Sequence, residues 1–168
     1  MAKLYICPLS ALEKTLMLSG ARSMIALGGP QADLPRPHAV TDAFLALKFN
    51  DIVEPRDGLV APSMADVEAI IAFAQQWQSN DPMLLQCWMG ISRSTAAALI
   101  VRTTLRPDLC ASSIAQDLRE RSPTATPNAL MVRLADEALD RQGTLTNAVA
   151  EIGRGANASE GTPFMIEI

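Results

Sequence analysis

The sequence has one histidine, His38, and three cysteines, Cys7, Cys87 and Cys110, among its 168 residues. No two cysteines form a Cys-x-x-Cys pair, so the sequence argues against a zinc site or a disulfide framework. His38 lies in the proline-rich segment PRPHAV, where a solvated side chain is the simplest interpretation. Catalysis by a Cys-His pair or a Ser-His-Asp triad would require this one histidine.

Charge and long apolar runs are also scarce. Charged residues make up 19% of the chain, and the formal net charge is -4 with a pI near 4.9. This balance gives no general attraction to nucleic acid or an anionic membrane, so a bound anion needs a local site. No apolar run approaches the ~18 residues of a membrane span. The N-terminal segment MAKLYICPLSALEK is a poor signal peptide, so a cytoplasmic location is expected.

Apolar residues make up 49% of the chain, which predicts a compact domain over residues 1–153 and a C-terminal tail over 154–168. The apolar end of the tail is expected to dock on the domain. Short apolar runs predict strands at residues 3–8, 22–30, 43–49 and 83–87. Strands and helices alternate, which predicts an α/β fold: a small, mostly parallel central sheet of four to five strands flanked by helices.

Capping signals place the starts of the predicted helices. Ser10 with Glu13, Ser63 with Asp66, and Ser113 with Gln116 have the spacing of capping boxes. A further helix is predicted from Thr126 as N-cap, through Pro127, to Gly143, and a short one from 144 to 152. A turn is predicted at residues 79–82.

The segment LLQCWMGISRSTAAALI, residues 84–100, carries the candidate site. Cys87 ends a predicted strand, Arg93 begins a predicted helix, and Gly90 lies in the tight loop between them. Such a loop turns backbone N–H groups inward beside a helix N-terminus, which favours an anion, and an arginine fork matches two phosphate oxygens.

The same positive field favours the thiolate form of Cys87, which would make it a nucleophile. Ser92 and Ser94 flank the arginine, where their hydroxyls reach the thiolate or the loop backbone. The alternative is that Cys87 is a buried structural thiol. The order of strand, glycine, arginine, serines and helix favours the nucleophile.

The motif CWMGISRSTAAALI resembles the signature loop of the cysteine-dependent protein tyrosine and dual-specificity phosphatases. The resemblance implies a phosphocysteine mechanism without metal or cofactor. In it Cys87 is the nucleophile, Arg93 binds the phosphoryl group, and Ser94 assists breakdown of the intermediate. Backbone amides of Trp88, Met89, Gly90, Ile91 and Ser92 would cradle the phosphate.

Two further matches extend the resemblance over roughly residues 44–134. Asp51, in FNDI, takes the place of the general-acid aspartate, although Glu54 and Asp57 share its loop. Asn128, in TPNALMVRL, takes the place of the asparagine that braces the phosphate loop. One position departs from the family, since Gln86 replaces the histidine before the nucleophile. That change is expected to alter the rigidity of the loop.

The sequence also bears on the substrate. Tyr5 is the only tyrosine, so a tyrosine-bearing recognition loop is absent, and Trp88 and Met89 are expected to edge a shallow pocket. The loop lacks the lysines of members that act on inositol phospholipids. A phosphorylated protein or a small phosphomonoester is the expected substrate. The alternatives are a phosphate-binding module with little turnover and, less favoured, a sulfur-transfer or arsenate-reducing enzyme.

Overall fold

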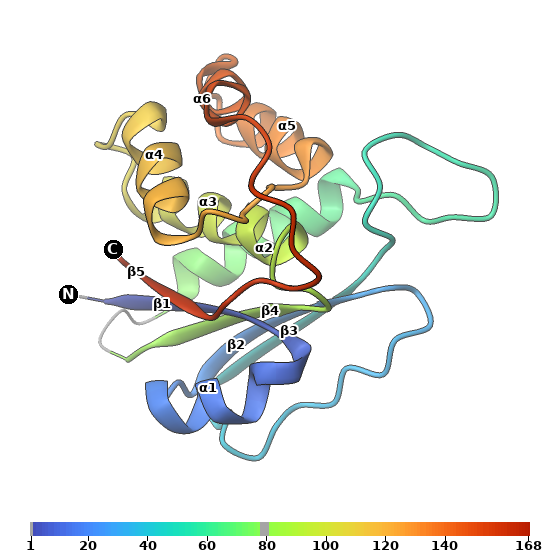
Figure 1. Cartoon of the computed structure of the whole chain (residues 1–168), viewed down its shortest axis with the longest axis vertical. Coiled ribbons are helices and arrows are strands. Elements are labelled where there is room, and N and C mark those ends of the chain that lie inside the picture. Colours follow the sequence, from blue (N-terminus) through green and yellow to red (C-terminus); the bar gives the residue numbers. More distant parts are fainter. Residues whose placement is uncertain (1, 78–80) are drawn as a thin grey trace.

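The computed structural model describes residues 2–77 and 81–168, and its centre is one twisted five-stranded sheet (Figure 1). The strand order is β3-β2-β4-β1-β5, with four parallel strands and β5 antiparallel to β1. This confirms the expected small, mostly parallel sheet. The strands are β1 (Lys3–Pro8), β2 (Ser23–Gly28), β3 (Ala43–Lys48), β4 (Met83–Cys87) and β5 (Phe164–Glu167).

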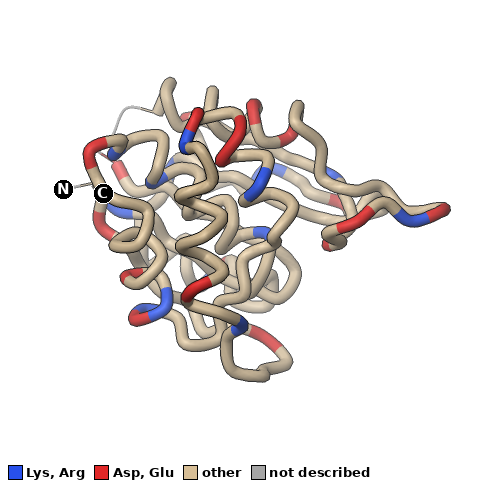
Figure 2. The backbone as a smooth tube through the Cα atoms, turned by 90° about the horizontal axis from the view of Figure 1, so that it is seen from above, with Lys and Arg blue, Asp and Glu red and all other residues tan. Residues whose placement is uncertain are grey.

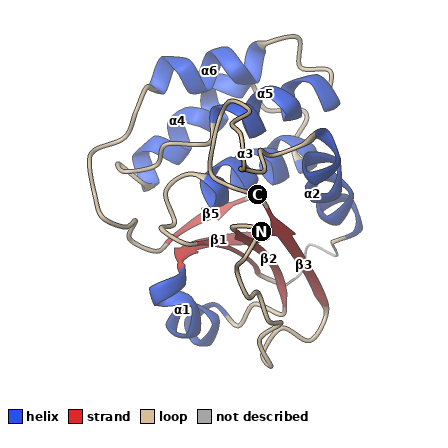
Figure 3. Cartoon of the chain, turned by 90° about the vertical axis from the view of Figure 1, so that its right-hand side faces the viewer, coloured by secondary structure: helices blue, strands red, loops and turns tan. Residues whose placement is uncertain are grey.

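Helices cover both faces of the sheet unequally (Figure 3). One face carries α1 (Leu12–Ser19), which follows a 3-10 turn at Leu9–Ala11. The other face carries α2 (Met64–Gln76), α3 (Arg93–Leu105), α4 (Ala111–Arg121), α5 (Ala129–Ala138) and α6 (Thr144–Ile152). None of the helices in the described part of the chain has the length and apolar character needed to cross a membrane.

The sheet separates two apolar clusters, because successive side chains of each strand point to opposite faces of the sheet. In β2, Ile25 and Leu27 join the large apolar cluster under α2–α6, whereas Met24 and Ala26 join the smaller cluster under α1. Helix α3 lies between the sheet and the outer helices, and its residues from Arg93 to Val101 are all buried. Burial on all sides accounts for the run of alanines at residues 96–98, because this part of the helix has no face toward solvent.

The capping box at Ser63 and Asp66 is confirmed, since both reciprocal hydrogen bonds are present. The box at Ser10 is wrong, because a 3-10 turn follows β1 directly and the N-cap of α1 is Ala11. The Ser10 hydroxyl donates to Glu160 at 2.7 Å. The box at Ser113 is also wrong: α4 begins two residues earlier, with Cys110 as N-cap.

Thr126 is not the N-cap of α5. That position belongs to Asn128, whose side-chain oxygen accepts a hydrogen bond from the N–H of Met131 at 3.0 Å. The helix ends at Ala138, and Gly143, with φ of 84°, is the N-cap of α6 and not a terminator of α5. Within the turn predicted at 79–82, residues 79 and 80 lie outside the described part of the chain.

The C-terminal residues 154–168 contribute to the sheet. Their apolar end was expected to dock, and it does so as β5, which pairs with β1 from Lys3 opposite Glu167 to Ile6 opposite Phe164. The preceding segment, residues 153–163, is called the strap below. It crosses the end of the sheet where β1 and β4 finish (Figure 1).

Candidate active site

The predicted site residues meet at the carboxyl ends of the parallel strands. The connection from β1 to β2 passes over one face of the sheet with α1, and the connection from β3 to β4 passes over the other with α2. The loop after β4 therefore opens where the chain changes faces, which is the usual position of a ligand in an open α/β sheet. Cys87 ends β4, and Arg93 begins α3.

The loop between Cys87 and Arg93 is held by its carbonyl oxygens, which point outward. Four of them accept hydrogen bonds from backbone N–H groups elsewhere in the fold. Among the described residues, the N–H groups of residues 88–92 donate to no protein acceptor. This polarity, with carbonyls outward and amides free, is that of an anion cradle. The bonds run from Leu9 to Trp88, from Gly161 to Met89, from Thr126 to Ile91, and from Asn128 to Ser92, at 3.2, 2.7, 2.9 and 3.3 Å.

Gly90 makes the turn of this loop possible. Its φ is 67°, in the left-handed region, and an added Cβ would lie 2.6 Å from the backbone nitrogen of Pro8. Only glycine fits a positive φ combined with such a close approach. The loop therefore packs directly against the end of β1.

Cys87 is 2% exposed, and its Sγ lies 3.1 Å from the Oγ of Ser94 on the first turn of α3. A hydroxyl at this distance can donate to a thiolate or, later, to a departing sulfur. The other buried thiol is Cys7 on β1, and burial raises its pKa to about 11 despite a hydrogen bond from Thr15. Cys7 therefore stays protonated at neutral pH.

Arg93 is 8% exposed, and its guanidinium is only partly satisfied by the protein. Nη1 donates to the carbonyl of Phe49 at 2.9 Å, whereas Nε is buried without a hydrogen-bond partner. A buried donor on a charged group is costly when left unpaired. An anion in the adjacent cavity would satisfy it.

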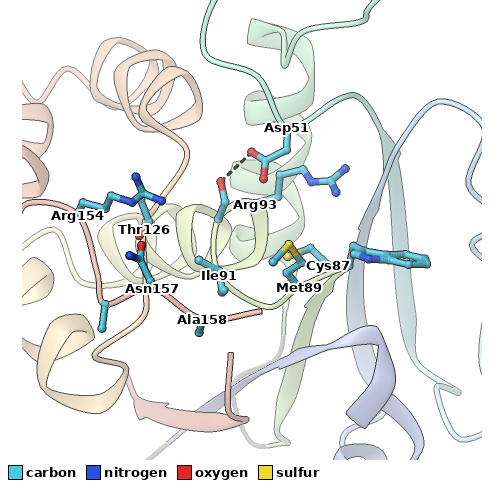
Figure 4. Close-up of a pocket in the computed structure, with 12 residues that line it drawn as sticks. Asp51, Cys87, Met89, Ile91, Arg93, Thr126, Arg154, Asn157 and Ala158 are labelled. Carbon is cyan, nitrogen blue, oxygen red and sulfur yellow. Dashed lines mark hydrogen bonds between the residues drawn. The ribbon is translucent and has the colours of Figure 1, made fainter. Parts of the chain in front are cut away.

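Asp51 lies beside the loop (Figure 4), and its Oδ1 accepts two hydrogen bonds. The donors are the hydroxyl of Ser92 at 2.7 Å and the side-chain nitrogen of Asn128 at 2.8 Å. Asn128 also donates to the carbonyl of Ile52, so one side chain fixes the acid-bearing loop and caps α5. The expectation that Asn128 braces the phosphate loop corresponds here to its backbone N–H bond to Ser92.

A cavity of about 580 Å³ connects these residues (Figure 4). Trp88 and Met89, which were expected at its edge, line it and are 68% and 39% exposed. The opposite end is formed by residues that the sequence did not single out as site residues: Thr126, Arg154, Ala156, Asn157 and Ala158. Nothing in their local sequence marks them. The four residues of the strap reach the cavity through the pairing of β5 with β1, and Thr126 is held there by its N–H bond to the carbonyl of Ile91.

Gln86 is 2% exposed and lines two smaller cavities on the α1 side of the sheet. Its side chain makes no hydrogen bond to the described residues. Gln86 therefore does not brace the loop, and the backbone bonds described above do so. Glu54 and Asp57, the rivals of Asp51, are exposed and do not line the cavity.

No cluster of three or more metal-ligating side chains occurs among residues 2–77 and 81–168. The third cysteine, Cys110, is exposed, and hydrogen bonds from the hydroxyl and the N–H of Ser113 lower the pKa of its thiol. It occupies the N-cap position of α4, and it does not line the cavity.

Known family models and curated proteins contain no match to this chain. Solved structures do match. Human DUSP28 aligns with a TM-score of 0.62 at 21% identity, over 83% of this chain and 94% of that chain. A mouse putative dual specificity phosphatase, solved with zinc tungstate, gives 0.62 at 18% identity, over 87% and 86%. The human tyrosine phosphatase-like serine/threonine/tyrosine-interacting protein gives 0.64 at 18%, over 83% and 92%. The fold is therefore the α/β fold of the dual-specificity phosphatases.

Proposed function

We propose that this protein is a phosphomonoester hydrolase of the tyrosine and dual-specificity type, which acts through a phosphocysteine. One observation carries the proposal: Cys87 lies at the base of a loop whose N–H groups have no acceptor in the described part of the chain, beside the unpaired Nε of Arg93. Both features call for an oxyanion next to the sulfur.

In the first step, the thiolate of Cys87 attacks phosphorus while the loop amides and Arg93 hold the three peripheral oxygens. An S–P bond forms and the ester P–O bond breaks. Asp51 supplies the proton to the departing oxygen. Both hydrogen bonds to Asp51 fall on Oδ1, so Oδ2 is the oxygen that carries this proton.

In the second step, water attacks phosphorus and gives a proton to Asp51. The S–P bond breaks, and its electron pair returns to Cys87 as a thiolate. Ser94 stabilises that thiolate through the 3.1 Å contact between its Oγ and the sulfur. The products are the free alcohol and inorganic phosphate. No metal ion or cofactor takes part in either step.

The open rim at Trp88 and Met89 suits a phosphorylated protein or a small phosphomonoester. The exposed indole of Trp88 offers a flat apolar surface beside the cradle for an aryl ester.

The test is turnover of phenyl phosphate, measured by phosphate release. Cys87→Ser should abolish turnover and retain vanadate binding, whereas Asp51→Asn should slow esters with poor leaving groups most. Cys110→Ser is the matched control and should leave turnover unchanged, since Cys110 lies outside the cavity. Undiminished turnover in Cys87→Ser would refute the mechanism.

A second candidate is a phosphate-binding module with little turnover. The position before the nucleophile favours it: Gln86 stands there in place of the histidine of the family that the loop resembles, and its buried side chain makes no hydrogen bond to the loop within the described residues. Calorimetry with a phosphotyrosine peptide, beside the turnover assay, separates the two. A binding module shows affinity with a negligible rate, and Gln86→His should then raise the rate.

A further inference from the structure

The cavity has two cationic ends, and the proposed reaction uses only one of them. Cys87 and Arg93 lie at one end, and Arg154 lies at the other with Asn157 (Figure 4). A phosphoryl group fills the first end only, since a cavity of about 580 Å³ is much larger than one phosphate. The rest of the substrate extends toward Arg154.

Within the described part of the chain, the charge of Arg154 is not neutralised by a protein partner. Its side chain makes no hydrogen bond or ion pair with residues 2–77 or 81–168. Among the residues that the structure describes, Asp51 is the one carboxylate that lines the cavity, and its Oδ1 already accepts hydrogen bonds from Ser92 and Asn128. The guanidinium is therefore available to a ligand.

The backbone at Arg154 is fixed on both sides. The carbonyl of Gly153 accepts a hydrogen bond from Arg119 at 2.8 Å, and the N–H of Gly155 donates to the hydroxyl of Thr126 at 3.1 Å. An added Cβ on Gly155 would lie 2.5 Å from backbone atoms of Thr124, so the strap is in close contact there. Fixing the backbone reduces the entropy lost when Arg154 binds a ligand.

The surrounding charge makes this cation distinctive. The chain carries a net charge of -4, and its charged residues of both signs are dispersed along the fold (Figure 2). The cavity is lined by two arginines, Arg93 and Arg154, against the single carboxylate of Asp51 among the described residues, so its lining is locally positive on an acidic protein. Such a lining favours a ligand with more than one negative group.

We propose that Arg154 binds a second anionic group of the substrate, a carboxylate or a phosphate on the same molecule as the phosphoester that reacts at Cys87. The inference rests on the proposed phosphatase function and specifies its substrate class. A small organic phosphate and a phosphopeptide with acidic neighbours both have this chemistry.

The test compares two pairs of substrates. The first pair is carboxyphenyl phosphate and phenyl phosphate. The second is a phosphotyrosine peptide flanked by glutamates and the same peptide with glutamines. In the wild type, kcat/KM should be higher for the anionic member of at least one pair, and that pair identifies the source of the second anion.

Arg154→Gln should lower the ratio of kcat/KM within that pair by about three- to tenfold, mostly through KM, because the contact holds ground state and transition state alike. Arg154→Lys should recover part of the ratio. Arg133→Gln, which removes an exposed arginine of α5 outside the cavity, is the matched control and should keep the wild-type ratio.

A ratio that Arg154→Gln leaves unchanged in both pairs would overturn the proposal, as would an equal loss in Arg133→Gln. Wild-type turnover of phenyl phosphate tests the phosphatase function separately. If no substrate is turned over, the phosphatase function fails, and the same ratios are taken from calorimetric dissociation constants of the wild type and both variants. If the ratio of dissociation constants then depends on Arg154, the second anion site stands without the phosphatase function. If the ratio does not depend on Arg154, the anion site is refuted as well.

Discussion

The two arginines of the cavity are positioned by opposite means. Arg93 is buried, and contacts of its own side chain hold it, with Nη1 bound to the carbonyl of Phe49. Arg154 has an exposed side chain, and the hydrogen bonds lie on its backbone neighbours, Gly153 and Gly155. The buried end suits a group that must be oriented to react. The exposed end suits a group that only needs to be attracted.

The largest effect is expected from a substitution at the buried end of the cavity. Arg93→Lys keeps the positive charge but loses the planar fork that reaches both Phe49 and the cavity. We expect kcat/KM to fall about 10²–10³-fold for every substrate, charged or neutral. Steady-state turnover of phenyl phosphate measures this, and a loss confined to substrates with a second anion would contradict the division between the two ends.

A smaller effect is expected when the strap is displaced. Gly155→Ala places a Cβ 2.5 Å from Thr124, so we expect unfolding free energy to fall by about 1–3 kcal/mol. Gly29→Ala is the matched control, since its added Cβ meets no atom within 4 Å. Urea denaturation measures both. Equal stability of the two variants would show that the strap yields locally and does not fix Arg154.

The smallest effect concerns Asn128, which joins the loop of Asp51 to α5. Asn128→Ala should lower the unfolding free energy by about 1 kcal/mol through loss of the helix cap. Asn128→Ser keeps a capping oxygen but cannot reach Asp51 as the longer side chain does. Both variants should slow turnover, and only the alanine variant should unfold more easily. Full activity in Asn128→Ser would show that Asp51 needs no such support.

The sequence predicts the four parallel strands and the loop at the buried end of the cavity well, because both depend on short-range patterns. The loop from Cys87 to Arg93 lies between a strand and a helix whose periodicity is visible in the sequence. The capping motifs were less reliable. Ser10 and Ser113 have the correct spacing, but a 3-10 turn and an earlier helix start take precedence at those positions.

The exposed end could not be predicted, because it depends on long-range pairing. Thr126 was expected only as a helix cap, and nothing near Arg154 marks it as part of a site. Arg154 reaches the cavity because β5 pairs with β1 at the edge of the sheet and carries the strap across the loop, whereas Thr126 is held there by its N–H bond to the carbonyl of Ile91. Pairing between strands so far apart leaves no local pattern in the sequence.

The contacts of the loop also imply an order of assembly. The carbonyl of Trp88 accepts a hydrogen bond from the N–H of Leu9, and the carbonyl of Met89 accepts one from the N–H of Gly161. The loop is therefore held by one residue that is synthesised before it and by one that is synthesised long after it. A nascent chain that ends before residue 161 has the proposed nucleophile and its arginine, but one side of the cradle is unsupported. We therefore expect the cradle to be complete only after residue 161 has left the ribosome and β5 has joined the sheet.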